Sequence, residues 1–194
     1  HLVVDIGGGT SDIAVISLSG VVESASIKIA GDQFNEAVNK YNRRKHNVLI
    51  GERTAEELKM SIGCVYPREE EQTMEIKGRD LMTGLPRAFT VSSSEMTEAF
   101  EEPTMRILEA VHSVLERTPP ELVADISNNA IVMSGGASLF WGIDRLNEQH
   151  TGIETPVADD AISCVAFGTG KSLEDVESMQ DGTMNLSRRK QMNT

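Results

Sequence analysis

Two apolar segments, residues 2–6 and 11–18, predict strands, and the glycine run between them is the feature that most limits how this chain can fold. The connection consists of Gly7, Gly8, Gly9 and Thr10. Because glycines lack Cβ atoms, successive backbone N–H groups can turn toward one point and surround an anion. We therefore predict a phosphate-binding turn, with Asp5 placed to hold a hydrated Mg²⁺ and Thr10 to orient a water or a phosphate oxygen. An ordinary glycine-rich hairpin turn is the alternative.

The composition argues against several classes of protein. The 194 residues carry a net charge of −12, which opposes general attraction to nucleic acids and to anionic lipids. No apolar run approaches the roughly 18 residues that a membrane span needs. Two isolated cysteines and four scattered histidines predict neither a disulfide framework nor a metal cluster, which fits a reducing cytoplasm. Because the chain begins at His1, directly at a strand, we also expect it to be part of a longer protein.

Hydrophobic periodicity and turn residues predict an alternation of strands and helices. The N-terminal part should contain strands at 2–6, 11–18 and 21–29, helices at 31–47 and 52–62, and further strands within 74–92. The C-terminal part should contain a helix at 94–117, a short helix to 127, a strand at 130–133, a helix at 137–148, a strand at 153–157 and a helix at 161–176.

Local features of the C-terminal part are also predicted. Pro103 indicates a kink or a new first turn in the long helix. Thr118 and Glu121 indicate a capping box at the start of the short helix that follows. The inward face of the helix at 137–148 is expected to consist of Leu139, Ile143 and Leu146.

This order of elements predicts an α/β fold with a ribonuclease-H-like core. Three antiparallel strands come first, and later strands joined by crossover helices should pair in parallel. We expect a core lobe at 1–32 and 97–176, an inserted small α+β lobe at 33–96 and a disordered tail at 177–194. Ligands in such folds bind at the carboxyl ends of the strands, where both glycine motifs lie.

Two further groups of residues are candidates for a ligand site. Gly135 and Gly136 lie between a strand and a helix start, where free N–H groups favour an anion or a flat polar ligand, although tight packing is the simpler explanation. Glu56 and Lys59 are three residues apart on one helix face and can together address sugar hydroxyls and a purine edge. An exposed ion pair is the alternative for this second group.

Several longer motifs resemble the MreB family of bacterial actin homologues over residues 2–174. They are Asp-Ile-Gly-Gly-Gly-Thr at 5–10, Ala-Gly-Asp at 30–32, Ile-Gly-Glu-Arg-Thr-Ala-Glu at 50–56, Gly-Arg-Asp-Leu-Met-Thr-Gly-Leu-Pro at 78–86, Thr-Pro-Pro-Glu-Leu at 118–122 and Ala-Asp-Asp at 158–160. The motif at 78–86 is much more specific than the glycines. The resemblance implies the second half of an actin-like ATPase.

The resemblance also implies roles for single residues. It places Asp5 near Mg²⁺ and Thr10 beside the attacking water, and it matches Glu56 and Lys59 to positions that contact adenosine. The second phosphate loop would be Gly7, Gly8, Gly9 and Thr10, with Gly31 and Asp32 also at the nucleotide. The adenine loop would be Gly135, Gly136, Ala137 and Ser138. The family usually has a third glycine where this chain has Ala137.

The function implied by the resemblance is that of a cytoskeletal ATPase. Such a protein binds ATP or ADP with Mg²⁺ between two halves and polymerises into filaments at the inner face of the cell membrane. The filaments direct cell-wall elongation and maintain rod shape, with the elongation machinery and membrane-bound proteins as partners. Membrane contact is expected through the first half, and nucleic acid is not an expected partner. The full-length protein should hydrolyse ATP slowly and this chain alone essentially not at all.

Two other functions remain open from the sequence. A sugar kinase or chaperone ATPase of the same superfamily would share the phosphate turn. A filament scaffold that hydrolyses nucleotide weakly would be consistent with Ala137.

Overall fold

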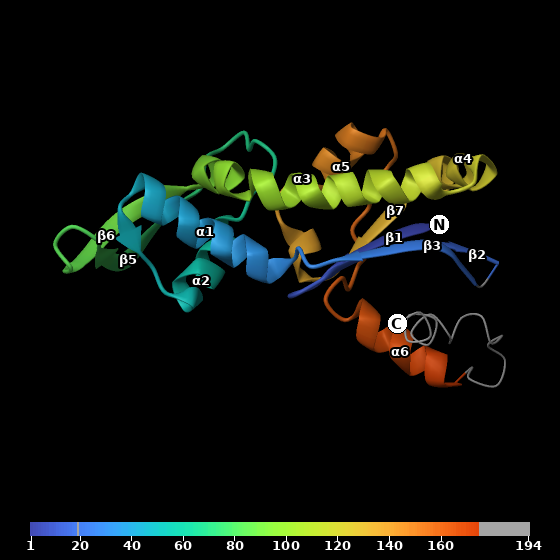
Figure 1. Cartoon of the computed structure of the whole chain (residues 1–194), viewed down its shortest axis with the longest axis horizontal. Coiled ribbons are helices and arrows are strands. Elements are labelled where there is room, and N and C mark those ends of the chain that lie inside the picture. Colours follow the sequence, from blue (N-terminus) through green and yellow to red (C-terminus); the bar gives the residue numbers. More distant parts are fainter. Residues whose placement is uncertain (19, 175–194) are drawn as a thin grey trace, which may run out of the picture.

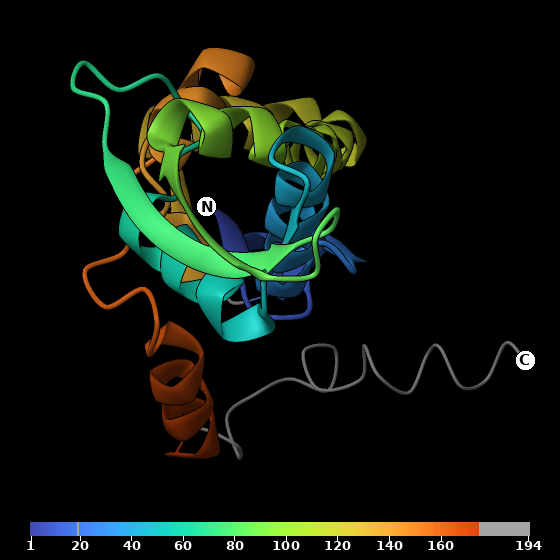
Figure 2. The same cartoon turned by 90° about the vertical axis from the view of Figure 1, so that its left-hand side faces the viewer.

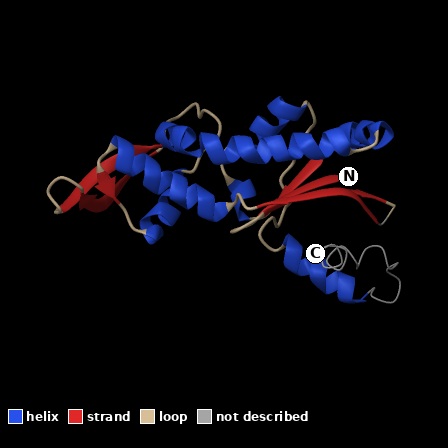
Figure 3. Ribbon diagram, in the orientation of Figure 1, coloured by secondary structure: helices blue, strands red, loops and turns tan. Residues whose placement is uncertain are grey.

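The computed structural model describes residues 1–18 and 20–174. Its strands form two separate sheets that lie toward opposite ends of the longest axis, with helices between and beside them (Figures 1 and 3). The predicted tail at 177–194 and the predicted end of the last helix at 176 lie outside the described residues. Within the described part, no helix combines the length and the hydrophobicity that crossing a bilayer requires.

The first sheet has four strands in the order β3-β2-β1-β7. Their bounds are Leu2–Ile6 (β1), Ser11–Ser17 (β2), Gly20–Ile27 (β3) and Ile131–Ser134 (β7). The first three pair antiparallel, and β7 pairs with β1 in parallel, as the sequence predicts. This parallel register sets Asp5 opposite Ser134, so the two glycine motifs leave the sheet side by side.

The second sheet has three antiparallel strands, β4 (Val48–Leu49), β5 (Thr73–Asp80) and β6 (Pro86–Ser92). The turn between β5 and β6 is held by Asp80, whose Oδ1 accepts hydrogen bonds from the backbone N–H groups of Met82 and Thr83. The sequence predicts β5 and β6 but not β4. Two residues are too few to show the alternation that marks a strand.

Helices connect and cover the sheets. Their bounds are Gly31–Lys45 (α1), Glu52–Ile62 (α2), Ser93–Arg117 (α3), Pro120–Asn129 (α4), Ile143–Thr151 (α5) and Cys164–Glu174 (α6), and a 3₁₀ turn, η1, spans Gly136–Leu139. The long helix α3 extends from the second sheet across the first (Figure 1). By contrast, α6 lies apart from the body of the molecule (Figure 2).

Three phenylalanines join the elements between the two sheets. Phe34 of α1 lies 4.9 Å from Phe100 of α3 and 4.8 Å from Phe140, measured between ring centroids. Phe34 and Phe100 are fully buried, and edge-to-face pairs of this kind add to the stability gained from burial. They fix α1 and α3 against the segment that follows η1.

The helix starts predicted at Pro103 and Thr118 differ from those in the structure. No new helix starts at Pro103, which is buried inside the continuous helix α3, because packing against α1 outweighs the loss of one backbone hydrogen bond. The capping box at Thr118 is not formed. Instead its hydroxyl donates to the carbonyl of Val114 at the end of α3, and Pro119 is the N-cap of α4.

Two predicted elements after β7 also differ. The helix expected at 137–148 is divided into η1 and α5, because Gly142 between them adopts a positive φ of 81° with Tyr66 packed against it. Leu139 is therefore 58% exposed rather than inward, while Ile143 is buried as predicted. The strand expected at 153–157 is only an extended segment, which accepts hydrogen bonds from Ile131 and Met133 of β7.

Candidate functional site

A cavity of about 560 Å³ lies where β1, β7, α1, α2 and η1 meet, and its volume falls in the range of small-molecule sites. All three candidate groups from the sequence contribute to its lining. From the predicted site it is lined by Asp5, Gly7, Gly8, Gly31, Glu56, Lys59, Gly135, Gly136 and Ala137. Residues separated by more than 100 positions in the chain thus form one site.

The turn between β1 and β2 is held from two sides. Gly7 donates to the carbonyl of Thr10 across the turn (3.0 Å), and the first turn of α1 donates to the carbonyls of Gly7 (3.0 Å) and Gly8 (2.8 Å). Within the described part of the chain, the N–H groups of Gly8, Gly9 and Thr10 donate to no protein acceptor. The turn is therefore rigid and keeps three backbone donors for a ligand.

The chain itself gives no steric reason for glycine at Gly8. A Cβ atom there would meet no protein atom within 4 Å, and φ lies outside the left-handed region that favours glycine. Open space on a fixed backbone at the edge of a cavity is what a closely bound ligand requires. Glycines outside the cavity, such as Gly51, face the same open space, so Gly8 is set apart by its place on the cavity wall.

Asp5 lies at the end of β1 on the cavity wall. Its Oδ1 accepts a hydrogen bond of 2.6 Å from the Ser134 hydroxyl, and Oδ2 has no protein donor among the described residues. Those residues also contain no cluster of three or more metal-binding side chains. A single carboxylate with one free oxygen fits Mg²⁺, which usually keeps several waters and takes one or two carboxylates.

Four predicted site residues do not line the cavity. They are Gly9, Thr10, Asp32 and Ser138. The Thr10 hydroxyl donates to Asp12 Oδ2 (3.1 Å), which leaves its oxygen as an acceptor on the exposed side of the turn. Asp32 donates its backbone N–H to Gly8, and the buried Ser138 hydroxyl donates to the carbonyl of Gly135. Asp32 and Ser138 therefore stabilise the glycine turns by hydrogen bonds without lining the cavity.

Glu56 and Lys59 form more than an exposed surface pair. Lys59 Nζ lies 2.7 Å from Glu56 Oε2 and also donates to the carbonyl of Gly31 (3.3 Å), and the Lys59 side chain is only 9% exposed. The Lys59 hydrogen bond, assisted by Asn35, lowers the pKa of Glu56 from its ordinary value of 4.5 against the opposing effect of desolvation. The pair thus links α2 to α1 and keeps a carboxylate at the cavity.

Glycine stands at the two positions after β7 for different physical reasons. Gly135 has φ of 85°, and a Cβ atom there would overlap the backbone of Ile6, so the fold itself requires glycine. At Gly136 a Cβ atom would meet no protein atom within 4 Å. Gly136 begins η1, so its N–H and that of Ala137 have no partner within the turn and remain available to a ligand.

The sequence did not predict the rest of the cavity wall. These residues are Met60, Gly63, Arg68, Leu139, Phe140, Trp141, Ile162 and Val165. Met60 and Leu139 could have been suspected because they adjoin predicted site residues. For Arg68 and Trp141 no local pattern gives a signal, since the tertiary fold brings them together.

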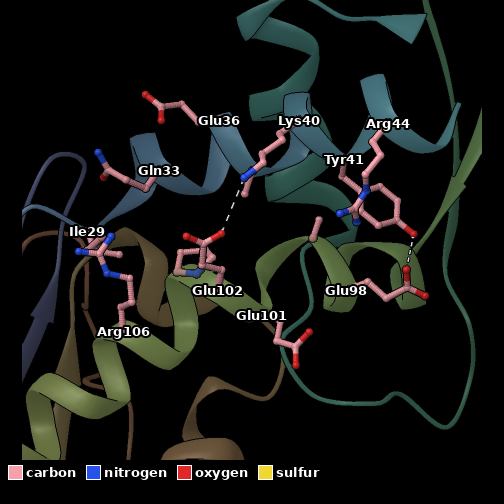
Figure 4. Close-up of a pocket in the computed structure, with 13 residues that line it drawn as sticks. Ile29, Gln33, Glu36, Lys40, Tyr41, Arg44, Glu98, Glu101, Glu102 and Arg106 are labelled. Atoms are coloured by element: carbon pink, nitrogen blue, oxygen red, sulfur yellow. Dashed lines mark hydrogen bonds and ion pairs between the residues drawn. The ribbon is translucent and has the colours of Figure 1, made fainter. Parts of the chain in front are cut away.

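A second cavity, of about 380 Å³, lies between α1 and α3 (Figure 4). Some of its polar groups are paired with one another, with Lys40 Nζ 3.9 Å from Glu102 and the Tyr41 hydroxyl donating to Glu98 at 2.6 Å. Burial and the Glu98 carboxylate raise the pKa of Tyr41. No glycine turn reaches this cavity, so it lacks the free backbone donors that distinguish the first one.

Known proteins resemble this chain closely. The sequence model of the MreB/Mbl protein family matches residues 1–181. The cell shape-determining protein MreB of Escherichia coli strain K12 is 50% identical over 176 residues, which are 91% of this chain and 51% of that protein. The cell shape-determining protein Mbl of Bacillus subtilis strain 168 is 45% identical over 179 residues, covering 92% and 54%. The chain spans about half the length of these relatives.

Solved structures agree with the predicted fold class. MreB5 of Spiroplasma citri bound to ADP has a TM-score of 0.88 and 39% identity, covering 91% of this chain and 54% of that protein, and the same protein was also solved with AMPPNP. The MamK double helical filament has a TM-score of 0.69 with 22% identity, covering 82% and 50%, and shows likeness of fold alone. The actin-like α/β fold predicted from the sequence is confirmed.

Proposed function

The chain belongs to the MreB/Mbl family, and on this premise we propose that its 560 Å³ cavity binds an adenine nucleotide with Mg²⁺. Membership decides against a sugar kinase or a chaperone ATPase. Two structures of the relative MreB5 contain ADP and AMPPNP, which supports a nucleotide at the corresponding place here.

In this proposal the turn from Gly7 to Thr10 holds the terminal phosphates. The three free N–H groups and the open space at Gly8 support this role, because backbone dipoles can surround an anion without added side chains. Thr10 orients the attacking water, since its hydroxyl hydrogen goes to Asp12 and its oxygen can accept a hydrogen bond from that water. Gly31 and Asp32 hold this turn by donating to it from α1.

The charges in the cavity support a role for a metal ion. The cavity is lined by two carboxylates, of Asp5 and Glu56, and by two cations, of Lys59 and Arg68. The charge of Lys59 is paired with that of Glu56. Phosphates added to such a site need a further cation close by. Asp5 would hold Mg²⁺ through its free Oδ2, and the ion would neutralise charge on the phosphate oxygens.

The sugar and base would occupy the other walls. Glu56 is placed to accept hydrogen bonds from ribose hydroxyls, with Lys59 fixing its position. The free N–H groups of Gly136 and Ala137 would face the base, and Ser138 supports this loop through its bond to Gly135. Ala137 is 4% exposed, so most of its surface is covered by the protein although the residue lines the cavity.

At the level of the whole protein, we propose an ATPase that binds its nucleotide between two halves, of which this chain is one. The sheet of β1, β2, β3 and β7 would belong to the core lobe at 1–32 and 97–176, and the smaller sheet to the inserted lobe at 33–96. The full-length protein would hydrolyse ATP slowly, and this chain alone essentially not at all. A filament scaffold with weak hydrolysis, which Ala137 suggests from the sequence, is the second candidate, and the burial of the Ala137 methyl group does not favour it over the ATPase.

The cellular role follows from the family. We propose self-assembly into filaments at the inner face of the cell membrane, where they direct cell-wall elongation together with membrane-bound partners and maintain rod shape. The relatives' description as cell shape-determining proteins supports this role. Membrane attachment through the part of the relatives that this chain does not span, and a cytoplasmic location, belong to the same proposal.

The observation that carries the nucleotide site is the open space at Gly8, and it defines the test. Gly8→Ala should weaken MgATP binding about tenfold or more, because a hydrogen bond to a charged group contributes about 1.5–3 kcal/mol and the methyl group would displace the phosphate. Stability should change little, since the methyl group meets no protein atom. The measurement is titration calorimetry of the full-length protein.

Gly51→Ala is the matched control. Gly51 also has nothing within 4 Å of an added Cβ, but it lies outside the cavity. This variant should bind MgATP like the wild type. Unchanged affinity in Gly8→Ala, or equal loss in both variants, would refute the phosphate assignment.

A further inference from the structure

Arg68 is an unpaired cation at the wall of the nucleotide cavity. Its side chain is half-buried, and its Nε is buried without a hydrogen-bond partner. Among the residues that the structure describes, the Arg68 guanidinium has no ion-pair partner. A buried donor without an acceptor is costly, and a ligand atom would remove that cost.

Trp141 holds this guanidinium in place. Arg68 Cζ lies 4.7 Å from the centroid of the Trp141 ring, within the distance at which a cation is attracted to an aromatic face. The two segments are also joined by their backbones, because Val65 donates to the carbonyl of Trp141 (3.0 Å) and Trp141 to that of Gly63 (3.4 Å). Arg68 is thus positioned before any ligand arrives.

The position of Arg68 indicates which part of a nucleotide it meets. Trp141 lies two residues after the end of η1, whose first residues supply the free N–H groups assigned to the base. The phosphate turn, by contrast, connects β1 to β2 and accepts hydrogen bonds from the start of α1. A planar guanidinium can stack on an aromatic ring and donate to ring nitrogens, whereas an ammonium group cannot stack in this way.

We propose that Arg68, held by Trp141, contacts the base of the bound nucleotide. This inference rests on the nucleotide site proposed above and adds a residue that selects for the base rather than for the phosphates. A triphosphate without a base should therefore bind independently of Arg68.

The test compares MgATP with magnesium tripolyphosphate in the full-length protein. Arg68→Ala should weaken MgATP roughly tenfold, the order expected for a desolvated cation–π or stacking contact, and leave tripolyphosphate unchanged. Arg68→Lys should behave like Arg68→Ala, because lysine keeps the positive charge but lacks the planar guanidinium group that stacks on a ring. Arg106→Ala, which removes a guanidinium from the cavity between α1 and α3, is the control and should bind both probes like the wild type.

Trp141 supplies an independent readout, measured as the part of the fluorescence change that Trp141→Phe removes. MgATP should change its fluorescence, tripolyphosphate should not, and Trp141→Phe should remove the response. Equal weakening of both probes by Arg68→Ala would make Arg68 a phosphate contact and overturn the inference, as would unchanged MgATP affinity. Failure of the wild type to bind MgATP would overturn the nucleotide site, and the role of Arg68 with it.

Discussion

Gly135→Ala should destabilise the fold far more than the same change one residue later. Gly135 has φ of 85° and ψ of 162°, a region that is essentially restricted to glycine and costs other residues about 1–3 kcal/mol. The added methyl group would also overlap the backbone of Ile6 in β1, which cannot move easily because β1 is paired on both sides. Overpacking of this kind typically adds about 1–3 kcal/mol, so we expect a total loss of about 3 kcal/mol or more.

The matched variant is Gly136→Ala, whose methyl group meets no protein atom within 4 Å. Its free energy of unfolding should stay within about 0.5 kcal/mol of the wild type. Urea unfolding followed by circular dichroism measures both values, and the midpoint temperature of Gly135→Ala should fall by roughly 6–12 °C. Equal stability of the two variants would refute the steric argument, and with it the different roles assigned to these glycines.

Two further predictions concern backbone strain and pH. Ala130→Gly should raise the free energy of unfolding by about 1 kcal/mol, because Ala130 adopts φ of 81° and ψ of 165°, and a lower midpoint temperature would contradict this. Lys59 lowers the pKa of Glu56, so their pair stabilises the fold above the ordinary carboxyl pKa and is lost as the pH falls through the lowered value. Because the Glu56 side chain is 44% exposed, Glu56→Gln should cost less than about 1 kcal/mol at pH 7. In urea unfolding the difference from wild type should shrink as the pH falls below the ordinary carboxyl pKa, and a difference that does not change with pH would count against the ion pair.

Much of the fold was predictable because its signals are local. Alternating apolar residues predict β1, β2 and β3, and helical spacing places Phe34 and Val38 on the buried face of α1. Predictions failed where distant residues decide local structure. Packing of Gly142 against Tyr66 divides the helix expected at 137–148, and the hydroxyl of Thr118 bonds backward to α3 rather than forward to α4.

The candidate site was predictable in part for the same reason. The glycine turns and the Glu56–Lys59 pair are short motifs with recognisable chemistry. The predicted residues at the ends of β1 and β7 and on α2 line the cavity, whereas Gly9, Thr10, Asp32 and Ser138 do not. Arg68 and Trp141 could not be predicted, because their significance arises only from their contact. The number of residues between them says nothing about a distance of 4.7 Å.

By itself, the sequence determined the strand-turn-strand unit at 2–18, the alternation of elements that follows and the family to which the chain belongs. These depend on side-chain periodicity, on glycine's conformational freedom and on motifs that lie within a few residues of one another. Only the tertiary structure decided that Gly8 faces open space while Gly135 presses against Ile6, and that Arg68 remains unpaired beside Trp141. Such differences depend on which atoms from distant parts of the chain occupy the same volume, and close packing settles that only in the folded protein.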